Sequence, residues 1–191
     1  MTLRLSLLRH GVTTRGGGFR GSLDDGLTAA GWAQMRAALA GRGGWARVVS
    51  SPLQRCVRFA ETLSLPLLIE PALRELHFGE WEGCSAAQVH ERDPQALARF
   101  WANPYGATPP GGEPVAAFAE RVWRAVDGLA VAYPGEALLV VTHGGVIRLL
   151  LAAARRMAPE RLLEVSVGHG ELFTLEGEPG AWQEVEPCGR C

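Results

Sequence analysis

Two histidines far apart in the chain each follow an apolar run and stand directly before a glycine. His10 follows Leu7-Leu8-Arg9, and His143 follows Val140-Val141-Thr142. An apolar run of about four to eight residues is typical of a buried strand, and a glycine at its end lets the backbone turn sharply. Because ligands bind at the carboxyl ends of strands in an open α/β sheet, we expect the two imidazoles to meet at that edge.

Two arginines accompany these histidines. Arg9 directly precedes the first one, and Arg55 lies at the start of a predicted helix, after Ser50-Ser51-Pro52-Leu53-Gln54. Guanidinium groups bind phosphate oxygens as forks, and the N–H groups of Gly144 and Gly145 at a helix start add further donors. The set predicts a phosphate pocket in which a neutral imidazole attacks phosphorus and forms a phosphohistidine that water hydrolyses. This chemistry requires no metal and no cofactor.

Such a reaction also needs an acid for the leaving alkoxide and a base for the incoming water, and one carboxyl group can serve as both in turn. The segment Glu75-Leu76-His77-Phe78-Gly79-Glu80-Trp81-Glu82 offers three candidates, Glu75, Glu80 and Glu82. A carboxyl group buried beside aromatic residues would have a raised pKa, which suits a proton donor. Spacing alone does not distinguish among the three.

Composition describes an ordinary globular chain. With 191 residues, 47% apolar and 20% charged, it is long enough for one well-covered domain. A net charge of −1 gives no general attraction for nucleic acid or an anionic membrane, so the expected partner is a small-molecule phosphate. The chain has no lysine, and the apolar run between Arg4 and Arg9 is too short for a secretory segment. We expect a cytoplasmic protein, and a homodimer is compatible with the sequence.

Strand and helix patterns alternate along the chain, which predicts an α/β fold, a three-layer α/β/α sandwich with a mostly parallel central sheet. We expect a domain over residues 1–177 and a C-terminal strand and tail over 178–191. The proline- and glycine-rich stretch 103–114 is the longest predicted loop. The predicted strands are 3–8, 48–50, 67–69, 137–142, 165–175 and 182–185. The predicted helices are 29–40 with Thr28 as N-cap, 51–65, 85–102 with a break near Pro94, 115–132 and 146–156.

Four segments together resemble, in order, the signatures of the histidine phosphatase superfamily, also called phosphoglycerate mutase-like. The resemblance covers roughly residues 3 to 175, and four ordered motifs are far more specific than the short Arg-His-Gly element alone. The segments are Arg9-His10-Gly11-Val12-Thr13, Ser50-Ser51-Pro52-Leu53-Gln54-Arg55, Glu75-Leu76-His77-Phe78-Gly79-Glu80-Trp81-Glu82-Gly83 and Thr142-His143-Gly144-Gly145.

The resemblance implies a role for each of these residues. His10 would be the phosphorylated nucleophile, and Glu75 the acid and base, which leaves Glu80 and Glu82 as supporting residues. Three side chains would hold the phosphoryl group together with the Gly144 N–H: Arg9, Arg55 and His143.

The chain departs from the family pattern at two positions. Val12 stands where the family often has Glu, and Gly16 stands where it often has an Asn that donates to phosphate. We hypothesise that N–H groups of the glycine run 16–18 replace that donor as an anion-binding nest.

Local stretches are similar to α-ribazole-5′-phosphate phosphatases, which remove phosphate during assembly of the cobalamin nucleotide loop. These stretches are residues 18–28, Phe100-Trp101 and residues 109–113. Aromatic side chains could stack on the base of such a substrate or belong to the core, namely Phe19, Phe78, Trp81 and Trp101. Candidate substrate-binding residues are Thr13, Arg20, Gly21 and Trp101.

Three other functions stay open. A broad-specificity or sugar phosphatase shares the chemistry, a phosphoglycerate mutase would retain the phosphoryl group, and a binding module would bind phosphate without turnover. His169 could line the pocket, whereas a zinc site of His10, His143 and His169 is not favoured because their spacing contains no short ligand pair. We assign no metal or redox role to the Cys188-Gly-Arg-Cys191 motif.

Overall fold

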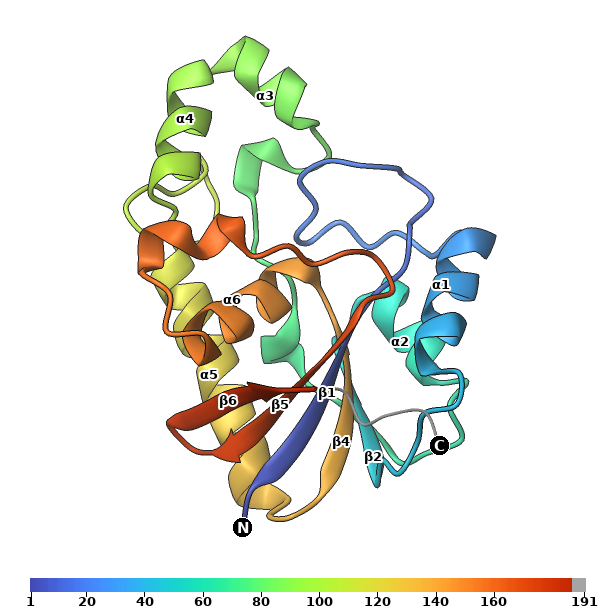
Figure 1. Cartoon of the computed structure of the whole chain (residues 1–191). Coiled ribbons are helices and arrows are strands. Elements are labelled where there is room, and N and C mark those ends of the chain that lie inside the picture. The colour runs from blue at the N-terminus through green and yellow to red at the C-terminus, as the bar shows by residue number, and fades with distance from the viewer. Residues whose placement is uncertain (187–191) are drawn as a thin grey trace.

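The structure, a computed structural model, describes residues 1–186 and builds them around one six-stranded sheet (Figure 1). The strand order is β3-β2-β4-β1-β5-β6; the first four of these run parallel, β5 runs antiparallel to β1, and β6 runs antiparallel to β5. Helices cover both faces, so the predicted three-layer sandwich is confirmed. The strands are β1 (Leu3–Arg9), β2 (Arg47–Ser50), β3 (Leu67–Ile69), β4 (Ala137–Thr142), β5 (Leu172–Glu178) and β6 (Ala181–Val185).

The helices form three groups. Helices α1 and α2 lie on one face of the sheet and α5 and α6 on the other, while α3 and α4 project beyond the carboxyl ends of the parallel strands (Figure 1). Their bounds are α1 (Ala29–Leu39), α2 (Gln54–Ala60), α3 (Ala86–Arg92), α4 (Pro94–Ala102), α5 (Val115–Ala132) and α6 (Gly144–Ala154). Short 3₁₀ helices are η1 (Pro71–Leu73), η2 (Gly79–Trp81) and η3 (Pro159–Glu164).

Successive side chains of the two central strands, β1 and β4, point to opposite faces of the sheet and contribute to a hydrophobic core on each face. In β4, Leu138 and Val140 belong to the core under α5 and α6, whereas Leu139 and Val141 belong to the core under α1 and α2. Successive side chains of a strand point to opposite faces, and a strand covered on both faces is therefore apolar throughout. This explains why such continuous apolar runs lead directly into the histidine motifs.

Several predicted elements match the structure closely. The helix 115–132 and the strand 137–142 have the predicted bounds. The hydroxyl of Thr28 accepts from the N–H of Gly31 as the N-cap of α1, and the chain breaks between α3 and α4 at Pro94. These are the positions where capping and proline chemistry are strongest.

The predicted helix 51–65 is too long at both ends, because α2 begins at Gln54 and stops at Ala60. The hydroxyl of Thr62 donates to the carbonyl of Phe59 at 2.7 Å, and Ser64 adopts a positive φ of 34°. A residue before proline also avoids the helical region, and Leu65 precedes Pro66. The chain therefore leaves the helix early and enters β3.

The predicted strand 165–175 begins only at Leu172, and the predicted helix 146–156 begins two residues earlier, at Gly144. Residues before Leu172 cross the carboxyl edge of the sheet, where arginine side chains bind the carbonyls of Val165 and Val167. These carbonyls serve as acceptors for side chains, so the segment is not part of the sheet.

The C-terminal part forms a hairpin of β5 and β6, in which Gly177 pairs with Trp182 and Glu178 with Ala181. The division expected at residue 178 stays an expectation. The Cys188–Cys191 motif lies outside the described residues. Within residues 1–186, no helix is both long and apolar enough to span a membrane.

Gly31 and Gly128 are a matched pair of helical glycines for testing the packing. A Cβ at Gly31 would overlap the carbonyl oxygen of Val12, whereas a Cβ at Gly128 would meet nothing within 4 Å. We expect Gly31→Ala to lower the free energy of unfolding by about 1–3 kcal/mol through overpacking. Gly128→Ala should raise it by about 0.5–1 kcal/mol, since alanine loses less backbone entropy in a helix. Urea denaturation measures both, and stabilisation by Gly31→Ala would contradict the close approach.

Candidate active site

The two motif histidines meet at the carboxyl ends of β1 and β4. These strands pair in parallel with Arg9 opposite Thr142, and the N–H of His10 donates to the Thr142 carbonyl at 3.0 Å. The imidazole rings of His10 and His143 lie 5.3 Å apart between centroids, at an angle of 64°. The expected meeting of the two side chains is therefore present.

The ring of His10 has a defined tautomer. Its Nδ1 lies 2.8 Å from the carbonyl oxygen of Gly11, and a carbonyl can only accept, so Nδ1 carries the proton. The lone pair on Nε2 is then available to attack an electrophile. The side chain is also buried, which keeps bulk water from competing for that lone pair.

Both histidines are neutral near pH 7. Burial, followed by the positive charge of Arg55, holds the pKa of His10 well below its ordinary value. Burial and Arg55 likewise hold the pKa of His143 well below the ordinary value. A neutral imidazole is the form that a nucleophile requires.

Arg55, at the start of α2, has a fully buried guanidinium group. Its Nε donates to Nδ1 of His143 at 3.2 Å, and a terminal nitrogen donates to the Gly21 carbonyl at 2.9 Å. The carboxylate of Asp25 lies 3.5 Å away. The other nitrogen of His143, Nε2, lies 2.7 Å from the hydroxyl of Ser51, so both ring nitrogens have partners within the protein. Direct phosphoryl binding by His143 stays a prediction.

Arg9 lies against the start of α6. Its terminal nitrogens contact the Val167 carbonyl and the Nε2 atom of His169, and its Nε is buried with no hydrogen-bond partner among residues 1–186. A Cβ at Gly144 would lie 3.1 Å from that Nε. Glycine at this position therefore leaves room for the guanidinium group beside the helix N-terminus.

The structure separates the three candidate carboxylates. Glu75 accepts the N–H of Gly145 at 2.9 Å through Oε2, at the start of α6, where a Cβ on Gly145 would overlap Oε1. Glu80 is exposed. Glu82 instead holds backbone, accepting four N–H groups, those of Gly21, Ser22, Leu23 and Phe78. Among the three, Glu75 alone lies at the start of α6.

The other predicted substrate contacts organise the loop after β1. Arg20 donates to the hydroxyl of Thr13, to Asp25 at 2.8 Å and to the carbonyls of Gly16 and Gly17. The N–H of Gly16 donates to the Thr13 carbonyl, so it is not free for the hypothesised anion nest. The nest stays a proposal for the N–H groups of Gly17 and Gly18. Gly21 is also predicted to contact substrate. Its N–H donates to Glu82 and its carbonyl accepts from Arg55, so both backbone groups have partners within the protein.

A cavity of about 440 Å³ opens beside Arg9, Glu75 and Gly144. Its walls carry the aromatic side chains Phe19, Phe78, Phe100, Trp101 and Phe118. Trp101 is 51% exposed, so a ligand in the cavity could contact its indole. Trp81 is buried and packs on Phe19 and Phe100, so of its two predicted roles the core is correct.

Arg148 also lines this cavity and was missed in the sequence. It donates through Nε to the Val165 carbonyl at 2.9 Å. It follows Gly144 by four residues, about one helical turn, so the two lie on the same face of α6. That spacing is the signal that would have identified it.

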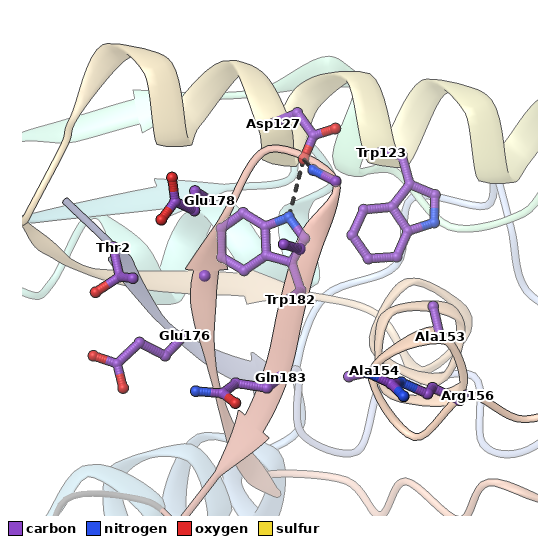
Figure 2. A pocket seen from close by; sticks show the side chains of 13 residues that line it. Thr2, Trp123, Asp127, Ala153, Ala154, Arg156, Glu176, Glu178, Trp182 and Gln183 are labelled. Atoms are coloured by element: carbon purple, nitrogen blue, oxygen red, sulfur yellow. Dashed lines mark hydrogen bonds between the residues drawn. The ribbon is translucent and has the colours of Figure 1, made fainter.

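A second, larger cavity of about 670 Å³ lies at the other end of α6, beside Ala153 and Ala154 (Figure 2). Figure 2 shows the indole of Trp182, which donates to Asp127 at 2.9 Å. Its lining contains no histidine or cysteine. The end of α6 is about 15 Å from its start, at 1.5 Å per residue. This cavity is therefore separate from the histidine cluster.

Comparison with known proteins identifies relatives across almost the whole chain. The sequence model of the histidine phosphatase superfamily (branch 1) matches residues 5–187. A bifunctional protein of Mycobacterium tuberculosis is 44% identical over 181 residues, covering 90% of this chain but 47% of that protein. The chain thus spans about half the length of this relative.

Two further proteins match along nearly their full lengths. The adenosylcobalamin/alpha-ribazole phosphatase of Salmonella typhimurium is 30% identical, covering 97% of this chain and 91% of that one. The crystal structure of a putative alpha-ribazole-5′-P phosphatase of Escherichia coli has a TM-score of 0.84 at 28% identity, covering 99% and 97% of the two chains.

The lowered pKa values of His10 and His143 predict a pH-dependent stability. As the pH falls below about 6.5, the unfolded chain protonates these side chains and the folded protein does not. The free energy of unfolding should therefore decrease with falling pH, by up to about 1.4 kcal/mol per pH unit for each histidine. Urea denaturation at pH 7.5, 6 and 5 measures this slope. His10→Asn should reduce it, and the exposed His90→Asn should not; equal slopes in all three proteins would contradict the interpretation.

Proposed function

The chain belongs to the histidine phosphatase superfamily, and from that premise we propose that it hydrolyses phosphomonoesters through a phosphohistidine on His10. The observation that carries the proposal is the arrangement of His10 itself. Its Nδ1–H is bound to the Gly11 carbonyl, its Nε2 is left as the nucleophilic atom, and Arg9 and Arg55 supply positive charge nearby. These features suit attack on a phosphoryl group.

In the first step, Nε2 of His10 forms a bond to phosphorus while the bond to the ester oxygen breaks. The ring becomes positively charged, and the hydrogen bond from Nδ1–H to Gly11 stabilises that charge. The protonated carboxyl group of Glu75 gives its proton to the departing alkoxide. The N–H of Gly144, at the start of α6, and the positive charges of the two arginines stabilise the phosphoryl oxygens.

In the second step, water attacks the phosphohistidine. The Glu75 carboxylate accepts a proton from that water, the nitrogen–phosphorus bond breaks, and inorganic phosphate leaves. His10 and Glu75 return to their initial states. The arginines provide the charge stabilisation that a metal ion provides in other phosphatases, which supports a metal-independent reaction.

We propose α-ribazole 5′-phosphate as the substrate. The cavity next to Arg9 and Glu75 has aromatic walls, which suit stacking on a planar base. Similarity to phosphatases named for this compound supports the same assignment.

A broad-specificity or sugar phosphatase is the second candidate. Arg148 favours it, because its guanidinium lines the cavity and its one hydrogen bond within residues 1–186 is to a backbone carbonyl. A sugar hydroxyl would provide a further acceptor.

A substrate panel tests the proposal. Phosphate release is measured in EDTA from α-ribazole 5′-phosphate, 3-phosphoglycerate, ribose 5-phosphate and an aryl phosphate. We expect the highest kcat/KM for α-ribazole 5′-phosphate and a loss of about 10³-fold or more in His10→Ala, because the covalent route requires the nucleophile. Equal turnover of the whole panel would favour the second candidate. Transfer between glycerate positions without phosphate release would indicate a mutase.

Glu75→Gln tests the acid. Glutamine keeps the side-chain length but cannot donate a proton as a carboxylic acid does. We expect kcat to fall about 10²-fold or more with an alkyl phosphate and much less with an activated aryl phosphate, whose phenolate leaves without a proton. Glu80→Gln is the matched control and should leave both rates near the wild-type values, since Glu80 is exposed. Equal losses with both substrates would exclude Glu75 as the leaving-group acid.

A further inference from the structure

Arg9 is held by two neutral acceptors from one segment of the chain. One terminal nitrogen donates to the Val167 carbonyl, and the other lies 3.1 Å from Nε2 of His169. A guanidinium group can only donate, so Nε2 of His169 must supply its lone pair. The imidazole of His169 is therefore neutral in this contact, with its proton on Nδ1.

Arg9 differs from the neighbouring arginines in its partners for ion pairing. Arg20 and Arg55 both form ion pairs with Asp25. Arg9 forms no ion pair with any carboxylate in residues 1–186, although its Nε is buried without a partner beside Gly144. The charges of Glu75 and Glu171 act on Arg9 from a distance, but neither carboxylate bonds to its guanidinium group, and one N–H donor is left for a ligand.

The position of His169 is fixed by the backbone around it. The N–H of Gly170 donates to the His10 carbonyl at 3.3 Å, and the backbone N–H of Arg9 donates to the backbone carbonyl of Glu171 at 3.0 Å. Gly170 has a φ of +68°, and a Cβ there would lie 2.7 Å from Cβ of Gln34. The His169 ring consequently lies 5.6 Å from that of His10, between centroids.

The electrostatic surroundings keep His169 in the accepting form. Burial, followed by the charges of Arg9 and Arg20, lowers the pKa of His169 to about 4. At neutral pH it accepts a hydrogen bond without bringing a negative charge.

We propose that His169 is a positioning residue: a neutral acceptor that directs the Arg9 guanidinium toward the phosphoryl group without neutralising its charge. This inference rests on the proposed function, because the ligand of Arg9 is the phosphoryl group of the substrate. A carboxylate in the same place would fix the guanidinium equally well but would compete with phosphate for its charge.

Three substitutions at one position separate geometry from charge. His169→Ala removes the acceptor, His169→Gln offers a neutral acceptor, and His169→Glu offers a charged one. The dissociation constant of inorganic phosphate is measured by ³¹P NMR titration of the full chain, with thermal unfolding as the check on folding. We expect phosphate binding to weaken about tenfold in His169→Ala and His169→Glu, and to recover to within about threefold of wild type in His169→Gln. His90→Ala, on an exposed face of α3, should leave binding unchanged.

A double-mutant cycle shows whether His169 acts through Arg9. In an Arg9→Ala background, His169→Ala should change phosphate affinity less than twofold, because the residue it positions is absent. Equal weakening in both backgrounds, a glutamine variant as weak as the alanine variant, or no weakening in any variant would each overturn the assignment. A wild-type protein that bound no phosphate would overturn the proposed phosphate site itself. Phosphate binding without turnover would overturn the proposed hydrolysis. The double-mutant cycle would still decide whether His169 positions Arg9.

Discussion

The buried guanidinium of Arg55 is the interaction on which the site depends. Removing a charged group from water is costly unless the group is paired and fully hydrogen-bonded. Arg55 meets this condition with the carboxylate of Asp25, the carbonyls of Gly21 and Leu23, and the imidazole of His143. These partners come from the loop after β1 and from the junction of β4 and α6. One side chain of α2 therefore joins segments that are far apart in sequence.

The same burial sets the protonation of the two histidines. Arg55 is the second cause, after burial, of the lowered pKa of both His10 and His143. The charge that holds the loop in place thus also keeps His10 neutral, the form that the proposed attack requires. Glu75 depends on a different constraint, since its carboxylate lies where any side chain at position 145 would overlap it. The contacts of Arg55 and Glu75 therefore hold the fold together and also set the charge and position of the groups in the site.

Local chemistry explains which features could be predicted from the sequence. The long helix 115–132 and the strand 137–142 have unambiguous apolar patterns, and Thr28 and Pro94 are strong boundary signals. The motifs also predicted that His10 and His143 meet at the carboxyl ends of β1 and β4. Spacing alone could not distinguish Glu75 from Glu82, although the family resemblance did, because the contacts of Glu82 are with N–H groups about sixty residues earlier in the chain. The segment before Leu172 has a strand-like pattern, but its carbonyls bind arginine side chains instead.

Helices that carry none of the motif residues build a large part of the cavity wall, although Arg9, Glu75 and Gly144 line it as well. Phe100 and Trp101 belong to α4, Phe118 to α5, and Leu162 and Leu163 to η3, whereas His10, Arg55 and His143 lie at strand ends and at the start of α2. The parts of the wall that belong to α4 and η3 can therefore change in sequence without altering the contacts that hold His10 and His143 together.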